Sequence, residues 1–281
     1  MHFFKPIFAA VLVFAAITVM AKPAEPRICV LGSCSGTEPM PNRHHTAWTL
    51  EIDGRVYLFD AGENAAYTAH INGIDLTKLH AIFISHPHLD HNAGLPHVFT
   101  VRNKLKARYK KPLAKQPLPI FTPLPKQVNA AIDLFSPYKG NNGMFDVKEV
   151  AAGIIFDDGT IKVEALPNFH IRPGADKKHY SYSYRIYAAG KKIVFSGDYR
   201  HLDNLGKLLD DCDLLLIETG HHKPWLTAET IRKTPAWNVR RLVFVHHGRD
   251  YLNHPAETAE KTKQAWGKTP EFAEDAMFIG L

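Results

Sequence analysis

The chain has 281 residues, of which 45% are hydrophobic and 22% charged, a composition that suits a folded globular protein and excludes a low-complexity chain. Its three cysteines are an odd number and do not form a disulfide framework. The formal net charge is +6. The segment from Arg102 to Lys126 contains no acidic residue, and six further Lys or Arg side chains lie between its two ends. This stretch is predicted to be an irregular, solvated loop, with an anionic partner as the alternative.

Residues 1–21 have the features of a signal peptide. Lys5 precedes an apolar run from Pro6 to Met20, and Val19-Met20-Ala21 resembles a small-x-small cleavage site. The run is short for a membrane-spanning helix, and polar, proline-containing sequence follows it. We therefore expect a periplasmic or extracellular protein whose mature domain is residues 22–281, with no stable membrane span after cleavage. An uncleaved N-terminal membrane anchor is the alternative.

Strands and helices alternate along the rest of the chain in two strand-rich blocks. The first block has expected strands at 28–31, 47–52, 56–60 and 81–85, and helices at 65–71 and 126–135. The second has expected strands at 154–156, 161–166, 182–187, 192–196, 213–218, 242–245 and 276–279, and helices at 202–209 and 255–266. Turn residues at 53–54, 157–159 and 189–190 predict three β-hairpins. Two such blocks predict an α/β fold with two facing β-sheets and outer helices, an αβ/βα four-layer sandwich.

A run of metal-competent side chains directly follows the strand expected at 81–85. It places four imidazole or carboxylate groups within six residues, in the order His86-Pro87-His88-Leu89-Asp90-His91. Residues two apart in an extended segment project to one side, so His86 and His88 can share one metal ion. Asp90 and His91 lie beyond the bend and can reach a second one. Imidazole and carboxylate ligands suit zinc, manganese or iron.

This HxHxDH run after a strand resembles the signature motif of the metallo-β-lactamase superfamily. Further segments resemble the family's other elements in the expected order: Phe59-Asp60-Ala61-Gly62, Pro167-Asn168-Phe169-His170, Phe195-Ser196-Gly197-Asp198, Leu242-Val243-Phe244-Val245-His246 and Phe272-Ala273-Glu274-Asp275-Ala276-Met277. In the last segment, Ala276 stands where the family usually has Gly. The resemblance covers roughly residues 27–281 and implies the family's sandwich fold.

The resemblance also implies a site for two divalent metal ions, with zinc as the default. The first metal would be held by His86, His88 and His170, the second by Asp90, His91 and His246, and Asp198 would bridge them. Such a site supplies a hydroxide for hydrolysis near neutral pH. His179 is an alternative to His170, and His247 is an alternative to His246.

Four residues are expected to serve catalysis: the ligand Asp90, and also Asp60, Glu218 and His221. By the resemblance, Asp60 orients a ligand histidine. Glu218 stands where ribonuclease Z-type enzymes carry a His-Glu-Ala-Thr segment, although Ile217 precedes it here. Glu218 is expected to orient His246 or a product group, and His221 or His222 to act as an acid. A polar loop at a strand end is the alternative.

The opening segment Leu31-Gly32-Ser33-Cys34-Ser35-Gly36 is similar to the start of the ribonuclease Z and phosphodiesterase branch, and by analogy it lies near the site mouth. This favours a phosphodiester or related phosphate ester as substrate. Only residues 171–197 separate His170 from Asp198, too few for the long arm of the tRNA-processing enzymes, so nucleic acid is not favoured. A carboxylic ester, lactone, thioester or β-lactam hydrolase, or a non-catalytic metal-loaded sensor, remains the alternative.

Overall fold

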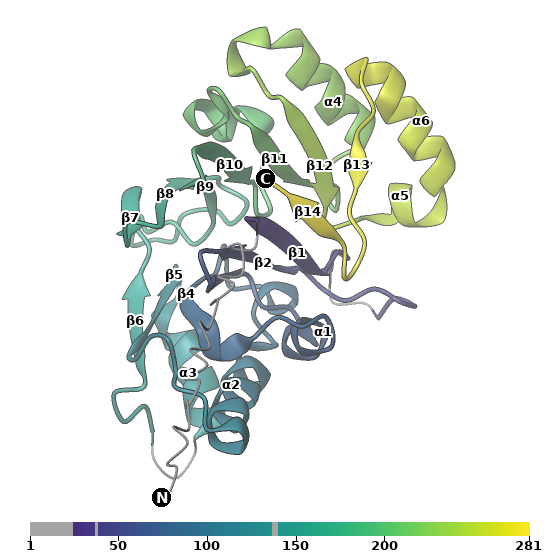
Figure 1. Cartoon of the computed structure of the whole chain (residues 1–281). Coiled ribbons are helices and arrows are strands. Elements are labelled where there is room, and N and C mark those ends of the chain that lie inside the picture. The colour runs from purple at the N-terminus through teal and green to yellow at the C-terminus, as the bar shows by residue number, and fades with distance from the viewer. Residues whose placement is uncertain (1–24, 37–38, 137–139) are drawn as a thin grey trace, which may run out of the picture.

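Two seven-stranded sheets face each other in the computed structural model, which describes residues 25–36, 39–136 and 140–281. Helices cover the outer face of each sheet, as the sandwich prediction requires (Figure 1). The expected signal peptide lies outside the described residues and stays a prediction from the sequence. Among the described residues, no helix is both long and apolar enough to span a membrane.

The first sheet is built by the N-terminal half of the chain and one C-terminal strand. Its order is β14-β1-β2-β3-β4-β5-β6. The bounds are β14 Phe278–Gly280, β1 Arg27–Gly32, β2 Ala47–Ile52, β3 Arg55–Phe59, β4 Leu79–Phe83, β5 Leu118–Thr122 and β6 Phe145–Glu149. The accompanying helices are α1 Ala65–Ile71, α2 Leu95–Tyr109 and α3 Pro125–Phe135, with short 3-10 turns η1 Leu76–Lys78 and η2 Leu89–His91. The last strand, β14, pairs antiparallel with β1 and forms one edge of this sheet.

The second sheet is built by the C-terminal half and has the order β13-β12-β11-β10-β9-β8-β7. The bounds are β7 Gly153–Asp157, β8 Ile161–Pro167, β9 Tyr182–Ala188, β10 Lys191–Phe195, β11 Leu214–Glu218, β12 Arg241–Val245 and β13 Glu271–Phe272. Its helices are α4 Pro224–Lys233, α5 Arg249–Asn253 and α6 Pro255–Trp266, with 3-10 turns η3 Leu202–Asn204, η4 Gly206–Leu209 and η5 Pro235–Trp237.

Aromatic side chains hold the two sheets together. Trp48 stacks on Phe59 with ring centroids 4.1 Å apart, and Phe59 stacks on Phe83 at 4.8 Å. From the second sheet, the ring of Phe195 meets Trp48 edge-on. All four side chains are buried, and separate apolar clusters lie under the outer helices of each sheet. Stacked and edge-on rings bury large areas with defined geometry, so this core fixes how the sheets face each other.

The three predicted hairpins are confirmed. In the first turn, both Asp53 and Gly54 have positive φ, at 50° and 72°. Paired positive φ values at two central residues are those of a type I′ turn, which matches the twist of the flanking strands.

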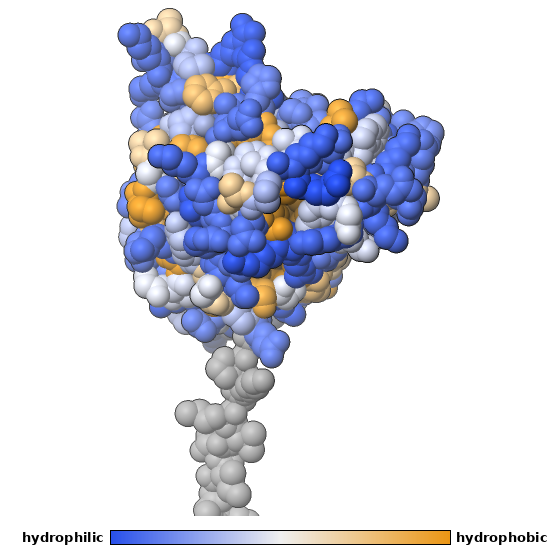
Figure 2. Space-filling view, turned by 90° about the horizontal axis from the view of Figure 1, so that it is seen from above, coloured by the Kyte–Doolittle hydropathy of each residue, from blue (hydrophilic) through white to orange (hydrophobic). Residues whose placement is uncertain are grey.

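On the face that Figure 2 presents, hydrophobic residues form small separate patches among hydrophilic ones.

Several element predictions were wrong. Residues 102–126 are not an irregular loop, since most of α2 and all of β5 fall in this stretch. Lys104, Lys106 and Arg108 are exposed on α2, while Val98, Phe99 and Arg102 of the same helix are buried. The basic side chains of Lys110, Lys111 and Lys115 follow the helix. The helix expected at 202–209 is the pair of 3-10 turns η3 and η4, and Gly206, the first residue of η4, has positive φ. Strand β6 and helix α4 were missed.

At the end of the sandwich where β3 begins, a half-buried carboxylate ties the two sheets together. Asp158, in the β7–β8 turn, accepts hydrogen bonds from the Tyr57 hydroxyl at 2.7 Å and from Arg55 at 2.8 Å. Its other oxygen accepts the backbone N–H groups of Thr160 and Ile161. Burial raises the pKa of Asp158, but these hydrogen bonds outweigh it and lower the pKa below the ordinary value. The native fold therefore favours the ionised carboxyl.

The Asp158→Asn variant should unfold with a free energy about 1–3 kcal/mol lower than the wild type at pH 7, the usual loss for hydrogen bonds to a charged group. The contribution is complete above the unfolded-chain pKa of about 3.9 and is lost as the pH falls through the lower native value. Urea unfolding at pH 7 and pH 3 measures it. Asp133→Asn, at an exposed position of α3, is the control. An equal loss at both pH values would contradict this role of the ionised carboxyl.

Candidate active site

The candidate site lies at one edge of the sandwich, where strands of both sheets end. Strands β3 and β4 pair in parallel, as do β10, β11 and β12, so their carboxyl ends meet at one edge. Polar residues follow these strands or β8: Asp60 after β3, His86 to His91 after β4, His170 after β8, Asp198 after β10, Glu218 at the end of β11 and His246 after β12. Ligand sites commonly form outside the carboxyl ends of strands.

Three histidines make the first group of the site. His86 Nε2 lies 3.0 Å from His88 Nδ1, and His170 Nε2 lies 3.4 Å from the same nitrogen. Their ligand atoms, with one of Asp198, all lie within 4.8 Å of one another. His86 is buried while His88 is exposed, so the group faces outward on one side.

The second group is fully buried. His91 Nε2 lies 3.2 Å from His246 Nε2, and the latter lies 3.4 Å from Asp90 Oδ2. Nearby carboxylates outweigh burial and raise the pKa of His246 to about 9. The second group is therefore rich in negative charge, which suits a cation.

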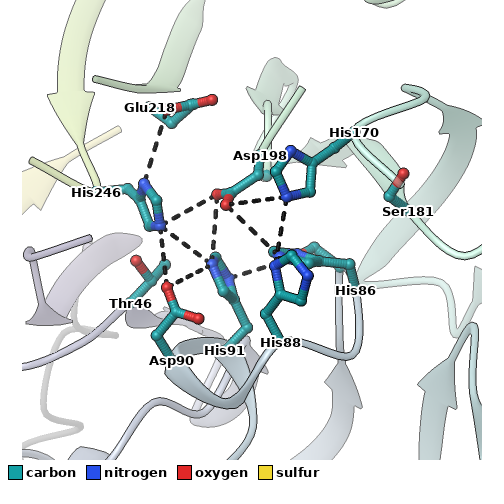
Figure 3. Close-up of polar contacts among 12 residues, drawn as sticks. Thr46, His86, His88, Asp90, His91, His170, Ser181, Asp198, Glu218 and His246 are labelled. Carbon is teal, nitrogen blue, oxygen red and sulfur yellow. Dashed lines mark hydrogen bonds and ion pairs between the residues drawn. The ribbon is translucent and has the colours of Figure 1, made fainter. Parts of the chain in front are cut away.

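Asp198 stands between the two groups (Figure 3). Its Oδ2 lies 3.6 Å from His86 Nε2 and 3.7 Å from His170 Nε2. Its Oδ1 lies 3.3 Å from His91 Nε2 and 3.2 Å from His246 Nε2. One carboxylate thus presents one oxygen to each group, which is the arrangement of a bridging ligand.

The chemistry of these groups fits two bound cations. Ring nitrogens of neighbouring histidines point at one another. A hydrogen bond between two such nitrogens needs a proton on one and a free lone pair on the other. The Oδ1 atom of Asp198 is buried without a hydrogen bond from any described residue. Buried polar atoms need a partner, and divalent metal ions held by nitrogen and oxygen ligands would provide one.

Asp60 sets the protonation pattern of one histidine in each group. It is fully buried, and its carboxylate lies 2.7 Å from His91 Nδ1 and 2.8 Å from the Ser85 hydroxyl. Because a carboxylate only accepts, the proton of His91 is on Nδ1 and its Nε2 is free for a ligand bond. The Ser85 hydroxyl donates to Asp60 and accepts from His86 Nδ1 at 3.0 Å, so Nε2 of His86 is free as well.

Asn168 positions the His170 loop against the Asp198 loop. It is fully buried, its side-chain oxygen accepts the His170 N–H at 3.2 Å, and its amide donates to the Ser196 carbonyl at 3.2 Å. The roles of Asn168 and Ser85 were missed in the sequence analysis. Both residues stand inside or beside a quoted motif, which was the only available signal.

Glu218 contacts two histidines at the site. Its Oε2 lies 3.7 Å from His246 Nδ1, and its Oε1 lies 3.1 Å from His221 Nδ1. Burial raises the pKa of Glu218, but the contacts with His221 and His246 outweigh burial and lower the pKa to about 2. The hydrogen bond that His221 donates to Glu218 raises the pKa of His221, while burial opposes this. Gly220 is required beside them, because a Cβ there would lie 2.6 Å from His246 Nδ1.

The alternative ligands do not lie with these groups. His247 is buried, and its Nε2 lies 2.7 Å from the Ala273 carbonyl, so it must donate there. Burial lowers the pKa of His247 to about 3. His179 packs edge-on against Phe169 and is in none of the described ligand groups. His170 and His246 therefore remain the proposed ligands.

The site opens into a cleft of about 460 Å³. Ser35 and Gly36 of the small-residue loop line it, as do His88, Asp198 and His221, whereas Cys34 is buried beneath. The loop therefore lies near the mouth, as the resemblance implied. His221 also forms a third possible ligand group with Asp198 and His246.

Residues 55–247 match the family model of the beta-lactamase superfamily domain. The chain belongs to this superfamily. A ribonuclease Z of Methanothermobacter thermautotrophicus is 24% identical, with 90% of this chain and 95% of that protein covered. A ribonuclease Z of Treponema pallidum is 45% identical, but the match spans 24% of this chain and about a fifth, 21%, of that protein's length. The structure of the short form of human tRNase Z superimposes with a TM-score of 0.62, covering 90% of this chain and 98% of that one at 21% identity.

The Asp60→Asn variant should bind the second of two divalent metal ions, tested with zinc as the probe, about 10–100-fold more weakly, the usual effect of losing a carboxylate behind a ligand histidine. The asparagine amide would donate to His91 Nδ1 and move the ring proton to Nε2, where the metal should bind. Chelator competition measures the affinity, and ¹⁵N chemical shifts of His91 report the tautomer. The matched control, Asp158→Asn, replaces a carboxylate at the far end of the sandwich. Unchanged affinity in the folded Asp60 variant would refute the role of Asp60.

Proposed function

We propose that this superfamily member is a metal-dependent hydrolase of phosphodiesters or related phosphate esters. The observation that carries the proposal is the Asp198 carboxylate, whose two oxygens face two complete ligand groups. Six further side chains converge on it: His86, His88 and His170 on one side, and Asp90, His91 and His246 on the other. Two cations held this way would lower the pKa of a shared water and offset the charge that develops on phosphorus-bound oxygens.

The chain's own residues divide the remaining work. Asp60 and Glu218 hold ligand histidines in one orientation. The cleft beside His88 and Ser35 admits the ester. In hydrolysis, a water oxygen bonds to phosphorus, the bond to the leaving oxygen breaks, and that oxygen needs a proton. His221 supplies it in this proposal, because Glu218 holds its Nδ1 and its other nitrogen is left for the cleft.

Two considerations favour a phosphodiester, and one disfavours precursor tRNA. A relative that matches nearly all of the chain is a ribonuclease Z, and the 32–36 loop resembles that branch. However, the segment between His170 and Asp198 is taken up largely by β9 and β10, leaving only the 171–181 loop between His170 and β9. No long arm can start there. We therefore propose a phosphodiester of modest size.

Purified zinc-loaded protein should cleave bis-p-nitrophenyl phosphate, and Asp198→Asn should lose at least about 100-fold in kcat/KM, the scale of removing one group that stabilises developing charge. Release of p-nitrophenolate at 405 nm measures turnover. A lactone, a thioester, nitrocefin and a short single-stranded RNA complete the panel.

Leu134→Asp, at an exposed position of α3, is the matched control for the assay. Cleavage of the lactone, thioester or nitrocefin in place of the phosphodiester would overturn the substrate class but keep the metal centre. No turnover of any ester by protein with two bound metals would overturn the hydrolase proposal.

The His221→Asn variant should discriminate between leaving groups. The p-nitrophenolate leaving group departs without a proton, so kcat for p-nitrophenyl esters should fall less than about fivefold. Alkyl esters need the proton, and their kcat should fall about 10²–10⁴-fold, the range of general acid catalysis. Both are measured on methyl phosphodiesters. The metal content, measured by atomic absorption, should stay at two ions. Loss of one ion would instead show that His221 is a ligand.

A further inference from the structure

A second cleft opens directly beside the candidate site. Its volume is about 330 Å³, and it is lined by Tyr199, Leu202, His222, Leu226 and Thr230 together with His221. His221 also lines the first cleft, so one side chain forms a wall of both. The two clefts therefore lie on either side of the proposed acid.

The back of this second cleft is a rigid aromatic platform. The rings of Tyr199 and His222 stack with centroids 4.1 Å apart and planes 9° from parallel. Tyr199 is buried and His222 is half-buried. His222 Nε2 lies 2.9 Å from the Tyr199 carbonyl oxygen and must donate to it, which locks the ring in place. A fixed planar ring at a cleft wall is a favourable surface for another planar group.

Part of the cleft wall is apolar, although Lys223 and His201 also line it. Leu226, in the first turn of α4, leaves 52% of its surface exposed, although nearby α4 residues Thr227 and Ala228 are buried. Leu202, from η3, lines the same cleft. An exposed leucine that lines the same cleft as a stacked ring pair favours a ligand with an aromatic or apolar part.

We propose that this second cleft binds the leaving group of the substrate and selects a planar aromatic or heterocyclic one. The proposal rests on the proposed function. A proton donor must face the leaving oxygen, so the group carried by that oxygen extends past His221. The space past His221 is the cleft with the aromatic platform. The retained part of the ester stays on the side of Ser35 and His88.

Leu226→Asp should raise KM about five- to tenfold for methyl p-nitrophenyl phosphate, because a charge replaces an apolar wall of the ring site. Phenyl p-nitrophenyl phosphate has the same leaving group and should show the same rise. Methyl 2,2,2-trifluoroethyl phosphate, with a small aliphatic leaving group followed by ¹⁹F NMR, should show no rise. Thr230→Trp, which fills the cleft from an exposed position, should behave likewise, and Leu134→Asp should leave KM unchanged.

Binding without turnover separates this inference from the proposed function. Calorimetry with zinc-loaded wild-type protein should show phenylphosphonate binding more tightly than methylphosphonate, and Leu226→Asp should remove that preference. If no ester is cleaved but this preference holds, the proposed function fails and the aromatic site stands. If esters are cleaved but neither variant alters KM or the preference, the second cleft is not the leaving-group site. A rise in KM that depends on the retained group, methyl or phenyl, and not on the leaving group would also overturn the assignment.

Discussion

The site depends on one buried charge, the carboxylate of Asp60. No part of this side chain is exposed, and an uncompensated buried carboxylate would be costly. It is compensated by the Ser85 N–H, the Ser85 hydroxyl and the His91 ring, all within 2.8 Å. These bonds join the end of β3 to the segment after β4. They also fix, directly or through Ser85, which nitrogen of His91 and His86 faces the centre. One histidine of each ligand group therefore takes its orientation from the same carboxylate.

The two sheets contribute unequal parts of the site, so the interface between them controls its geometry. The first sheet supplies His86, His88, Asp90 and His91 in one short segment, whereas the second supplies His170, Asp198 and His246 from three separate strand ends. Hydrogen bonds across the interface connect them near the site: the Tyr184 hydroxyl donates to the Ile84 carbonyl at 2.7 Å, and the Tyr182 N–H donates to the Ser85 carbonyl at 3.0 Å. Each ligand group combines residues of both sheets, so a change in how the sheets face each other would move His170 and His246 relative to the segment after β4 and alter both groups at once.

The sequence predicted the architecture and the converging side chains because these depend on local patterns. Apolar runs with turn residues between them predicted the hairpins, and a dense cluster of imidazoles directly after a strand is typical of a metal site. Helices α2 and α4 were both missed, because lysines and arginines on their solvent faces obscure the apolar spacing. Local patterns also do not reveal conformation at single residues. Asp60 and His246 both have positive φ, at 53° and 50°, in an unusual region that is held only by tertiary contacts.

In the proposed function, His221 serves as the proton donor although Ile217 stands where ribonuclease Z-type enzymes carry a histidine before the glutamate. Ile217, which takes that place, is buried in the cluster under the outer helices and cannot reach the cleft. Glu218, the next residue, faces the site, and the turn after it brings His221 back so that its N–H and Nδ1 both contact the same carboxylate. The pair is thus formed within four residues. Leu226 at the start of α4 lines the cleft next to His221, so the proposed proton supply and the proposed leaving-group recognition would be adjacent in both sequence and space.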